Sequence, residues 1–135
     1  MIDYHVHTAL CRHASGEMED YVIAAKRCGL DAMGFADHLP FDASYMKDLT
    51  MSRNDLADYI KIIPELEKRC GIKIYTGIEA DYYPEKQEEI RKLIDQYSFD
   101  YVYGSVHFIN GWGFDNPAFL TEWEKHDVDL VFKAY

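Results

Sequence analysis

The chain lacks the sequence features of disulfide-stabilised, zinc-ribbon, secreted and membrane-spanning proteins. Its three cysteines are odd in number and no two of them form a Cys-x-x-Cys pair, so neither a disulfide framework nor a zinc ribbon is indicated. No basic segment with an apolar h-region precedes the first predicted strand, and no apolar run is long enough to span a bilayer. We therefore expect a soluble protein of the reducing cytoplasm that does not bind membranes.

Basic residues are also scarce. The chain has 14 Lys and Arg against 24 Asp and Glu, a formal net charge of −10, and its basic residues are scattered rather than gathered into a stripe. A protein that binds nucleic acid independently of sequence needs many cations to neutralise phosphates, so the composition argues against such a partner. A small phosphorylated substrate is compatible with this charge, because bound divalent ions reverse the local potential.

The composition is that of one globular domain. Hydrophobic residues make up 48% of the 135 residues and aromatic residues 15%, which is enough for a core. Apolar runs typical of strands begin near residues 2, 30, 72 and 101, and a helical pattern lies in each interval. This alternation predicts a single α/β domain over residues 1–135, with a parallel sheet and right-handed crossovers.

Start and stop signals bound the predicted helices. The first helix, over residues 17–28, is acidic in its first turn and basic in its last turn, as the helix dipole favours. The second begins at Ser52, which forms a capping-box-like pair with Asp55, and ends at Gly71. A third apolar stripe predicts a helix over residues 85–97.

The last predicted helix begins at the N-cap residue Asp127 and has no signal for its end. Its apolar stripe runs into the last residue through Val128, Val131, Phe132 and Tyr135. Four strand-helix units are about half of a TIM-like barrel, which typically needs ~250 residues. We therefore expect the chain to be a C-terminally truncated half-barrel whose unpaired strand edge favours self-association.

Two connections are longer than the usual few residues, over 39–51 and 108–126. Both leave the C-terminal end of a predicted strand. Long loops at that position commonly shape a substrate pocket, so we expect the substrate to bind there.

Several potential metal ligands share one position, at the end of a predicted strand or in the loop just after it. They are His5, His7, His13, His38, Glu79 and His107. Because the C-terminal ends of parallel strands meet on one face of a barrel, we expect these side chains to converge. A mixture of imidazoles and a carboxylate suits zinc, manganese or iron rather than calcium. The sequence therefore predicts divalent metal ions as cofactors.

Three of these residues carry an argument of their own. His5 and His7 are two positions apart on a strand, so both rings point to the same face and can hold one cation. Taken alone, the pair would also fit alternating polar positions on an ordinary strand. Glu79 ends a strand that is expected to be buried, where an unpaired carboxylate is costly and a cation would remove that cost.

Neighbouring residues allow more than one interpretation. Asp37 is either a ligand or the residue that holds the second ring nitrogen of His38 and fixes its tautomer, and we favour the second role. Cys11, in the loop before His13, is interpreted as a small packed thiol. His126 lies among charged residues at a helix entrance and is interpreted as solvated.

The short motifs around these residues follow one another in a defined order. They are Asp3-Tyr4-His5-Val6-His7-Thr8, Cys11-Arg12-His13, Phe35-Ala36-Asp37-His38, Gly77-Ile78-Glu79-Ala80-Asp81-Tyr82 and Gly104-Ser105-Val106-His107-Phe108. The ordered set resembles the successive motifs of the polymerase and histidinol phosphatase (PHP) superfamily, most closely its histidinol-phosphatase branch, over nearly the whole chain. The resemblance implies the N-terminal half of a distorted (β/α)7 TIM-like barrel with a trinuclear metal centre that hydrolyses phosphoesters.

The resemblance also implies how three ions of zinc, manganese or iron would be held. The two histidines of the first motif and Glu79 would bind one ion, and Glu79 would bridge to a second ion that His107 also binds. His13 and His38 would bind the third ion. Further ligands of the family, including a late Asp-x-His pair, are expected beyond the part of the barrel that this chain contains.

The predicted catalytic residues are Glu79, His107 and Asp37. Basic residues that could bind a phosphate are few near the motifs. Arg12 and Arg53 are the predicted substrate-binding residues, whereas Lys47 is interpreted as solvated.

The leading functional hypothesis is hydrolysis of L-histidinol phosphate to L-histidinol and phosphate in histidine biosynthesis, by water that metal ions activate. Amidohydrolases also begin with His-x-His on the first barrel strand, but they need a lysine on the fourth strand, where this chain has His107. Two further hypotheses stay open: a PHP phosphoesterase with a different substrate, and a catalytically silent metal-binding fragment.

Overall fold

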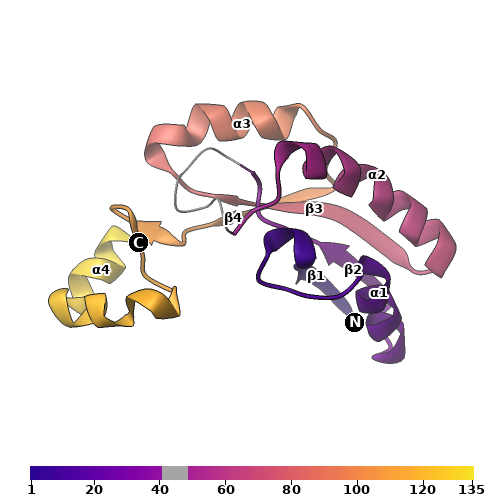
Figure 1. Cartoon of the computed structure of the whole chain (residues 1–135), viewed down its shortest axis with the longest axis horizontal. Helices are drawn as coiled ribbons and strands as arrows, with labels where there is room; N and C mark the ends of the chain where they lie inside the picture. Colours follow the sequence, from indigo (N-terminus) through magenta and orange to yellow (C-terminus); the bar gives the residue numbers. More distant parts are fainter. Residues whose placement is uncertain (41–48) are drawn as a thin grey trace.

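The computed structural model describes residues 1–40 and 49–135, in which strands and helices alternate as predicted (Figure 1). The main elements are β1 (Ile2–Val6), α1 (Met18–Arg27), β2 (Ala32–Phe35), α2 (Arg53–Cys70), β3 (Lys73–Asp81), α3 (Gln87–Asp95), β4 (Tyr101–Ser105), β5 (Phe108–Ile109), β6 (Trp112–Gly113) and α4 (Val128–Ala134). Three 3-10 helices join them: η1 (Ala9–Cys11), η2 (Pro84–Lys86) and η3 (Pro117–Lys125).

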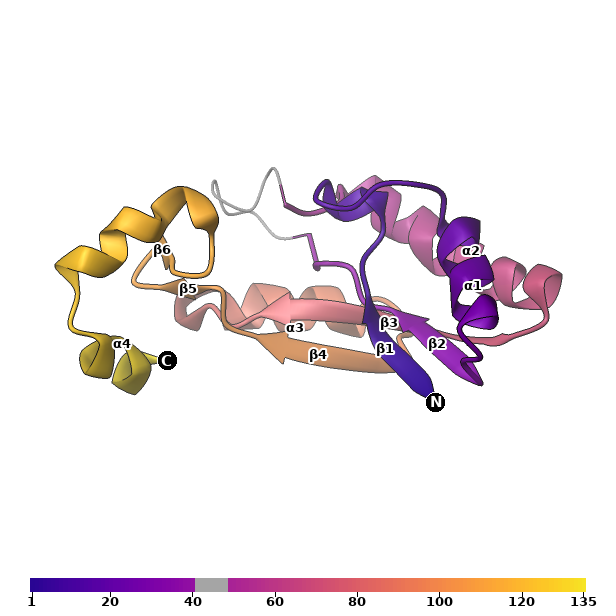
Figure 2. The same cartoon turned by 90° about the horizontal axis from the view of Figure 1, so that it is seen from below.

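The four long strands form one parallel sheet in the order β1-β2-β3-β4, and β5 pairs with β6 in a separate antiparallel ladder. Helices α1 and α2 lie on one side of the sheet, and the described residues leave the opposite side open (Figure 2). The sheet curls into an open half-barrel, so the predicted α/β fold with parallel strands is confirmed.

The register of the sheet aligns the C-terminal ends of its strands. Glu79 on β3 pairs with Tyr103 on β4, and an isolated bridge joins His38 to Glu79 beyond the end of β2. Two backbone hydrogen bonds fix that bridge, from the Glu79 N–H to the Asp37 carbonyl at 2.9 Å and from the Leu39 N–H to the Glu79 carbonyl at 2.7 Å. The motifs that contain His38, Glu79 and His107, at the ends of β2, β3 and β4, therefore reach one edge of the sheet.

Local signals placed the helix ends well. Ser52 caps α2 in the predicted box with Asp55, and Gly71 ends the helix with a φ of 63°, in the left-handed region that glycine tolerates. The helix predicted over 85–97 is shorter, because its first turn is the 3-10 helix η2 and the regular part ends at Asp95. None of the helices in the described part of the chain is both long and apolar enough to cross a bilayer.

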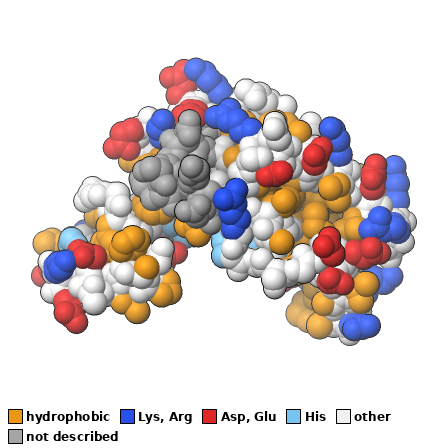
Figure 3. All heavy atoms as spheres, viewed as in Figure 1, with side chains coloured by type: hydrophobic (Ala, Val, Ile, Leu, Met, Phe, Trp, Pro, Cys, Tyr) orange, Lys and Arg blue, Asp and Glu red, His pale blue; other side chains and the backbone are white. Residues whose placement is uncertain are grey.

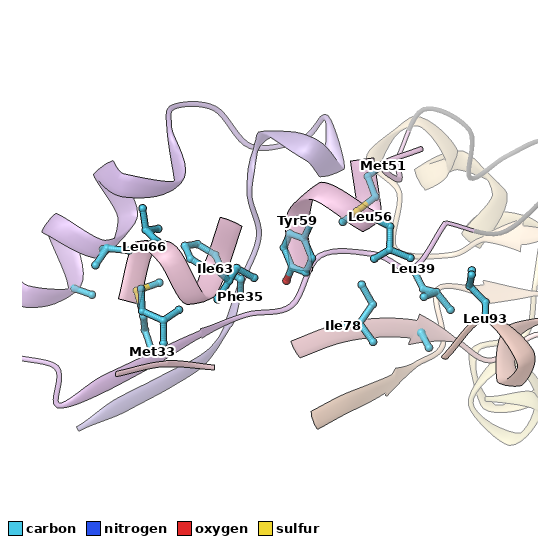
Figure 4. Close-up of a cluster of buried hydrophobic side chains, with 14 of the residues drawn as sticks. Met33, Phe35, Leu39, Met51, Leu56, Tyr59, Ile63, Leu66, Ile78 and Leu93 are labelled. Atoms are coloured by element: carbon cyan, nitrogen blue, oxygen red, sulfur yellow. The ribbon is translucent and has the colours of Figure 1, made fainter. Parts of the chain in front are cut away.

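The hydrophobic core lies between α2 and the outer face of the sheet (Figure 4). Side chains that alternate along the strands, such as Met33 and Ile78, point toward the apolar stripe of α2, and they are almost fully buried. Tyr59 of α2 is fully buried, and its hydroxyl donates to the Gly77 carbonyl at 2.9 Å. Burying each such side chain contributes roughly 1.5–3 kcal/mol, so this layer fixes the sheet that carries the site.

The inner face of the sheet is lined by tyrosines. Tyr101 lies across neighbouring strands, and its hydroxyl donates to the carbonyls of Tyr4 at 2.5 Å and Phe35 at 3.1 Å. The ring of Tyr101 can occupy this position only because glycines lie beneath it. A Cβ at Gly34 would lie 2.2 Å from the Tyr101 hydroxyl oxygen, and a Cβ at Gly77 would lie 2.1 Å from the Tyr101 Cζ atom. The inner face is therefore packed from β1 to β4 around one ring.

The connection over 108–126, predicted as a long loop, contains β5, β6 and η3 and lies apart from the sheet with α4 (Figure 1). Trp112 and Trp123 pack edge to face with ring centroids 4.9 Å apart, and His126 is exposed and stacks on Trp112. Of the predicted stripe on α4 only Val131 is buried, and Phe132 is 68% exposed. Hydrophobic side chains accordingly cover much of this segment in Figure 3.

Of the other predicted long loop, residues 41–48 lie outside the described residues. Lys47, which we interpreted as solvated, is among them. Over the helices seen in Figure 3, Lys and Arg side chains are interspersed with Asp and Glu, so no basic stripe forms on that face.

Candidate metal centre

The carboxylate of Glu79 is the centre of a cluster of imidazoles. Its Oε2 lies 3.2 Å from the Nε2 atoms of His5 and His7 and 3.2 Å from the Nδ1 atom of His38. Its Oε1 lies 3.6 Å from the Nε2 atom of His107. Glu79 itself is only 3% exposed. Residues from the ends of all four strands therefore converge on one buried carboxylate, as the sequence predicted.

The first strand and the residue that follows it contribute His5 and His7 to this cluster. The pairing of β1 with β2 shifts register between Asp3 and Val6, and this irregularity precedes the loop that holds His7. The rings of His5 and His7 have centroids 5.0 Å apart, and both reach the same Glu79 oxygen. The His-x-His pair is therefore part of a convergent site and not merely alternating polar positions on a strand.

His13 extends the cluster toward solvent. Its ring centroid lies 4.9 Å from that of His7 and 5.3 Å from that of His38, and the residue is exposed. Ligand atoms of His7, Cys11 and His13 all lie within 4.8 Å of one another. The structure thus brings all six predicted ligands together and adds Cys11 beside them.

The donor geometry fits transition-metal ions. Within residues 1–40 and 49–135, the buried Oε2 atom of Glu79 and Nδ1 atom of His38 have no hydrogen-bond partner, although they lie only 3.2 Å apart. Tetrahedral zinc with ligand bonds of about 2.0–2.2 Å separates its ligand atoms by roughly 3.3–3.6 Å, close to the observed spacing. Buried polar atoms without partners are costly, and a bound cation would satisfy both of them. Two groups share Glu79 and have ligand atoms within 4.8 Å of one another: His5, His7 and Glu79, and His38, Glu79 and His107.

The protonation states also suit metal binding. Burial alone would raise the pKa of Glu79, but the close imidazoles of His7, His38 and His5 lower it to about 2, so the carboxylate is ionised. Burial lowers the pKa of His38 to about 4, so its ring is neutral at pH 7 and offers a lone pair. Burial also lowers the pKa of His13. Ligands in these states need to lose no proton to bind a cation at neutral pH.

Comparison with known proteins agrees with this geometry. The model of the PHP domain family matches residues 3–134 of the chain. The chain belongs to the PHP domain family. The amidohydrolase hypothesis is thereby replaced, in agreement with the histidine in place of a lysine after β4.

Curated relatives of this PHP domain carry one name. The chain is 35% identical to a probable histidinol-phosphatase of Deinococcus radiodurans, in an alignment that covers all of this chain and 53% of the relative. It is 31% identical to a histidinol-phosphatase of Bacillus subtilis, over 98% of this chain and 52% of the relative. The chain therefore spans about half the length of the curated relatives it matches.

A solved structure supports the fold. The chain superposes with a TM-score of 0.72 and 29% identity on the crystal structure of histidinol phosphate phosphatase from Lactococcus lactis, complexed with zinc, L-histidinol and phosphate. The superposition covers 82% of this chain and 41% of that protein. The half-barrel of this PHP domain therefore has a counterpart in a relative that was solved in complex with zinc.

Asp37 has a different partner from the one predicted. It is fully buried and accepts hydrogen bonds from the Thr8 N–H at 2.6 Å, the Thr8 hydroxyl at 2.6 Å and the Cys11 thiol at 2.8 Å. No hydrogen bond joins Asp37 to the His38 ring among the described residues. The expected tautomer-fixing contact is thus wrong in this structure, because the backbone turns the Asp37 side chain away from the ring of its neighbour. Asp37 anchors the loop after β1 instead.

Cys11 completes that anchor. Burial raises the pKa of its thiol, so the sulfur keeps its proton and donates it to Asp37. The same sulfur accepts the His38 N–H at 3.0 Å and lies 3.4 Å from the Nδ1 atom of His7. The predicted packed thiol is therefore confirmed, and its contacts place it directly behind two of the predicted metal ligands, His7 and His38.

We expect Asp37→Asn to lower the free energy of unfolding by about 1–3 kcal/mol, because the amide nitrogen cannot accept the hydrogen bonds that Thr8 and Cys11 donate. Urea unfolding of the metal-free chain measures this loss. Asp58→Asn, at a side chain that is 71% exposed, is the matched control and should change stability by less than about 0.5 kcal/mol.

Metal affinity should fall less in Asp37→Asn than in His38→Ala. Equal losses of affinity would make Asp37 a direct ligand.

Asp81 is a residue of the site that the sequence prediction missed. It is 3% exposed on β3, two positions after Glu79, and its Oδ1 lies 2.7 Å from the Nδ1 atom of His107. This contact raises the pKa of His107. The alternation of side chains on a strand could have found Asp81, because positions 79 and 81 face the same side.

The two predicted substrate-binding arginines occupy different surroundings. Arg12 is exposed beside His13 and has a positive φ of 62° at the end of η1. Arg53 begins α2, and its guanidinium pairs with Glu89 of α3 at 3.1 Å. The surface hollow that Arg53 lines contains none of the six predicted ligands. Arg12 thus adjoins the cluster residue His13 along the chain, whereas the structure does not bring Arg53 into the cluster.

Proposed function

We propose that this chain forms the N-terminal half of the active site of a metal-dependent phosphomonoesterase that hydrolyses L-histidinol phosphate to L-histidinol and phosphate. The observation that carries the proposal is the single buried carboxylate of Glu79 within reach of imidazoles from all four strands. Relatives named histidinol-phosphatase support the substrate. The reaction belongs to histidine biosynthesis, and we place it in the cytoplasm.

The cofactors would be three divalent ions of zinc, manganese or iron. Glu79 would bridge two of them, one completed by the His-x-His pair and the other by His107, while His13 and His38 would hold the third. Ions bound there would polarise the phosphoryl oxygens and activate water for attack on phosphorus. Glu79 and His107 are thus the proposed catalytic residues, and Asp37 acts from behind them by holding the loop that follows β1.

The residues around the cluster give the substrate a place to enter. The imidazole of His5 is 45% exposed and His13 is exposed, whereas Glu79 and His38 are buried beneath them. A dianionic phosphate approaches a chain whose net charge is −10, so we propose that bound ions and Arg12 supply the positive charge at the site. Arg12 beside His13 is the proposed phosphate-binding side chain.

The proposal is tested by completing the barrel. We expect the polypeptide of residues 1–135 to self-associate, because exposed apolar residues such as Phe132 remain uncovered. We also expect it to release little or no phosphate from histidinol phosphate, because further ligands of the family are expected from the other half of the barrel. Joining residues 1–135 to the C-terminal half of the Deinococcus relative should give turnover of about 1 per second or more, a typical enzyme rate. Phosphate release and sedimentation measure both outcomes.

Three results would contradict parts of the proposal. Activity of the chimera that survives removal of metal by a chelator would contradict metal-dependent chemistry. A folded, metal-loaded chimera that hydrolyses another phosphomonoester but not histidinol phosphate would favour a PHP phosphoesterase with a different substrate. A monomer of residues 1–135 that turns over histidinol phosphate at a full rate would show that this half is sufficient alone.

A further inference from the structure

The side chain of Asp81 is buried at the metal cluster without belonging to any of its candidate ligand groups. Its Oδ1 is 2.7 Å from the Nδ1 atom of His107 and 3.2 Å from the backbone nitrogen of the same residue, which donates to it. One carboxylate oxygen therefore binds both the ring and the main chain of His107. Two contacts to one residue fix the position of the ring and its rotation.

The opposite nitrogen of the same ring faces the cluster. The Nε2 atom of His107 lies 3.6 Å from Oε1 of Glu79, on the side away from Asp81. A neutral imidazole has one N–H and one lone pair, and a carboxylate at Nδ1 can only accept. The contact with Asp81 therefore places the proton on Nδ1 and leaves the lone pair on Nε2, where a cation beside Glu79 would bind.

We infer that Asp81 is a positioning residue, which holds His107 in the tautomer and orientation that a metal ion shared with Glu79 requires. The inference rests on the proposed metal-dependent function and adds a residue to it. Asp81 takes toward His107 the role that the sequence suggested for Asp37 toward His38. The other oxygen of Asp81, Oδ2, is buried, has no hydrogen-bond partner in the part of the chain that the structure describes, and lies 3.9 Å from the Nδ1 atom of His38.

The tautomer can be measured without metal. In the metal-free chimera that completes the barrel, ¹⁵N NMR of the imidazoles, at a pH where they are neutral, should show the proton of His107 on Nδ1. Asp81→Ala should move it to Nε2, and Asp81→Asn should leave it on Nδ1, because the amide oxygen still accepts. Asp115→Asn is the matched control. Asp115 is a half-exposed carboxylate 4.0 Å from Nε2 of the same ring, and its replacement should leave the tautomer unchanged.

The metal affinity of the same variants tests the consequence. Zinc titration should show an affinity about 10–100-fold lower in Asp81→Ala, the typical cost of losing such an orienting group, and a smaller loss in Asp81→Asn. His107→Ala provides the reference for complete loss of that ligand. Combining His107→Ala with Asp81→Ala should add little to His107→Ala alone, because Asp81 acts through His107.

The outcomes separate the two proposals. An unsubstituted chimera with the His107 proton on Nε2, or an Asp81→Ala variant with unchanged tautomer and zinc affinity, would overturn the role of Asp81. Loss of a whole ion in Asp81→Asn with the tautomer retained would make Asp81 a ligand and overturn the positioning role as well. An unsubstituted chimera that has the Nδ1 tautomer but binds no ion would overturn the proposed function instead.

Discussion

Replacing Glu79 by Gln is expected to remove more than one metal ion per chain. One Glu79 oxygen lies 3.2 Å from three imidazole nitrogens and the other lies on the side of His107, so two neighbouring ions would share its charge. The amide keeps the shape of the side chain but loses the charge and replaces one ligand oxygen with a nitrogen that cannot bind a cation. Elemental analysis of the purified chain after dialysis against zinc measures the loss.

The control for this experiment is Glu88→Gln. It makes the same chemical change at a helix carboxylate that is 84% exposed and pairs with Lys92, so the metal content should be unchanged. In the chimera that completes the barrel, Glu79→Gln should reduce phosphate release by at least about 10²-fold, in the range seen when one group that stabilises transition-state charge is removed. Loss of one ion or fewer would show that Glu79 is a ligand of a single ion and not a bridge.

Gly77→Ala is expected to have the largest effect on stability. The added Cβ would lie 2.1 Å from the Cζ atom of Tyr101, whose ring is held in place by hydrogen bonds to the carbonyls of Tyr4 and Phe35. The strand or the ring must move, and overpacking of this kind costs about 1–3 kcal/mol and occasionally more. The loss of unfolding free energy is measured by urea denaturation of the metal-free chain.

Gly104 is the matched control, because it lies on the neighbouring strand β4 and its added Cβ would meet no atom of the described residues within 4 Å. Gly104→Ala should leave stability nearly unchanged. Replacing Tyr101 by Leu should remove most of the further cost of Gly77→Ala, so the two substitutions should be strongly non-additive. Additive losses would show that the strain arises elsewhere than at the ring of Tyr101.

Much of the fold was determined by local sequence signals. The cap at Ser52, the left-handed glycine at Gly71 and the alternating apolar runs act over a few residues, so the elements they predict are found where expected. The 3-10 turn that shortens the third helix and the elements within the connection over 108–126 were missed, because short elements depend on packing more than on local pattern.

The convergence of the six predicted metal ligands was predictable for a topological reason. Parallel strands carry their C-terminal ends to one edge, so polar residues that follow apolar runs meet there whatever their separation in sequence. The ligand atoms of Glu79 and His107 belong to one such group although 28 positions separate the residues. This convergence follows from the order of elements and needs no knowledge of side-chain angles.

By itself, the sequence determined the parallel α/β fold and the set of residues that converge on Glu79. Only the tertiary structure decided which carboxylate supports which ring: Asp37 turns to Thr8 and Cys11, and Asp81 binds His107. The physical reason is that such contacts depend on the direction of each side chain and on the positions of its atoms. Strand register and packing set both of these, whereas adjacency in the chain does not. The pairing of Arg53 with Glu89 was decided in the same way, because two helices had to pack before those side chains could meet.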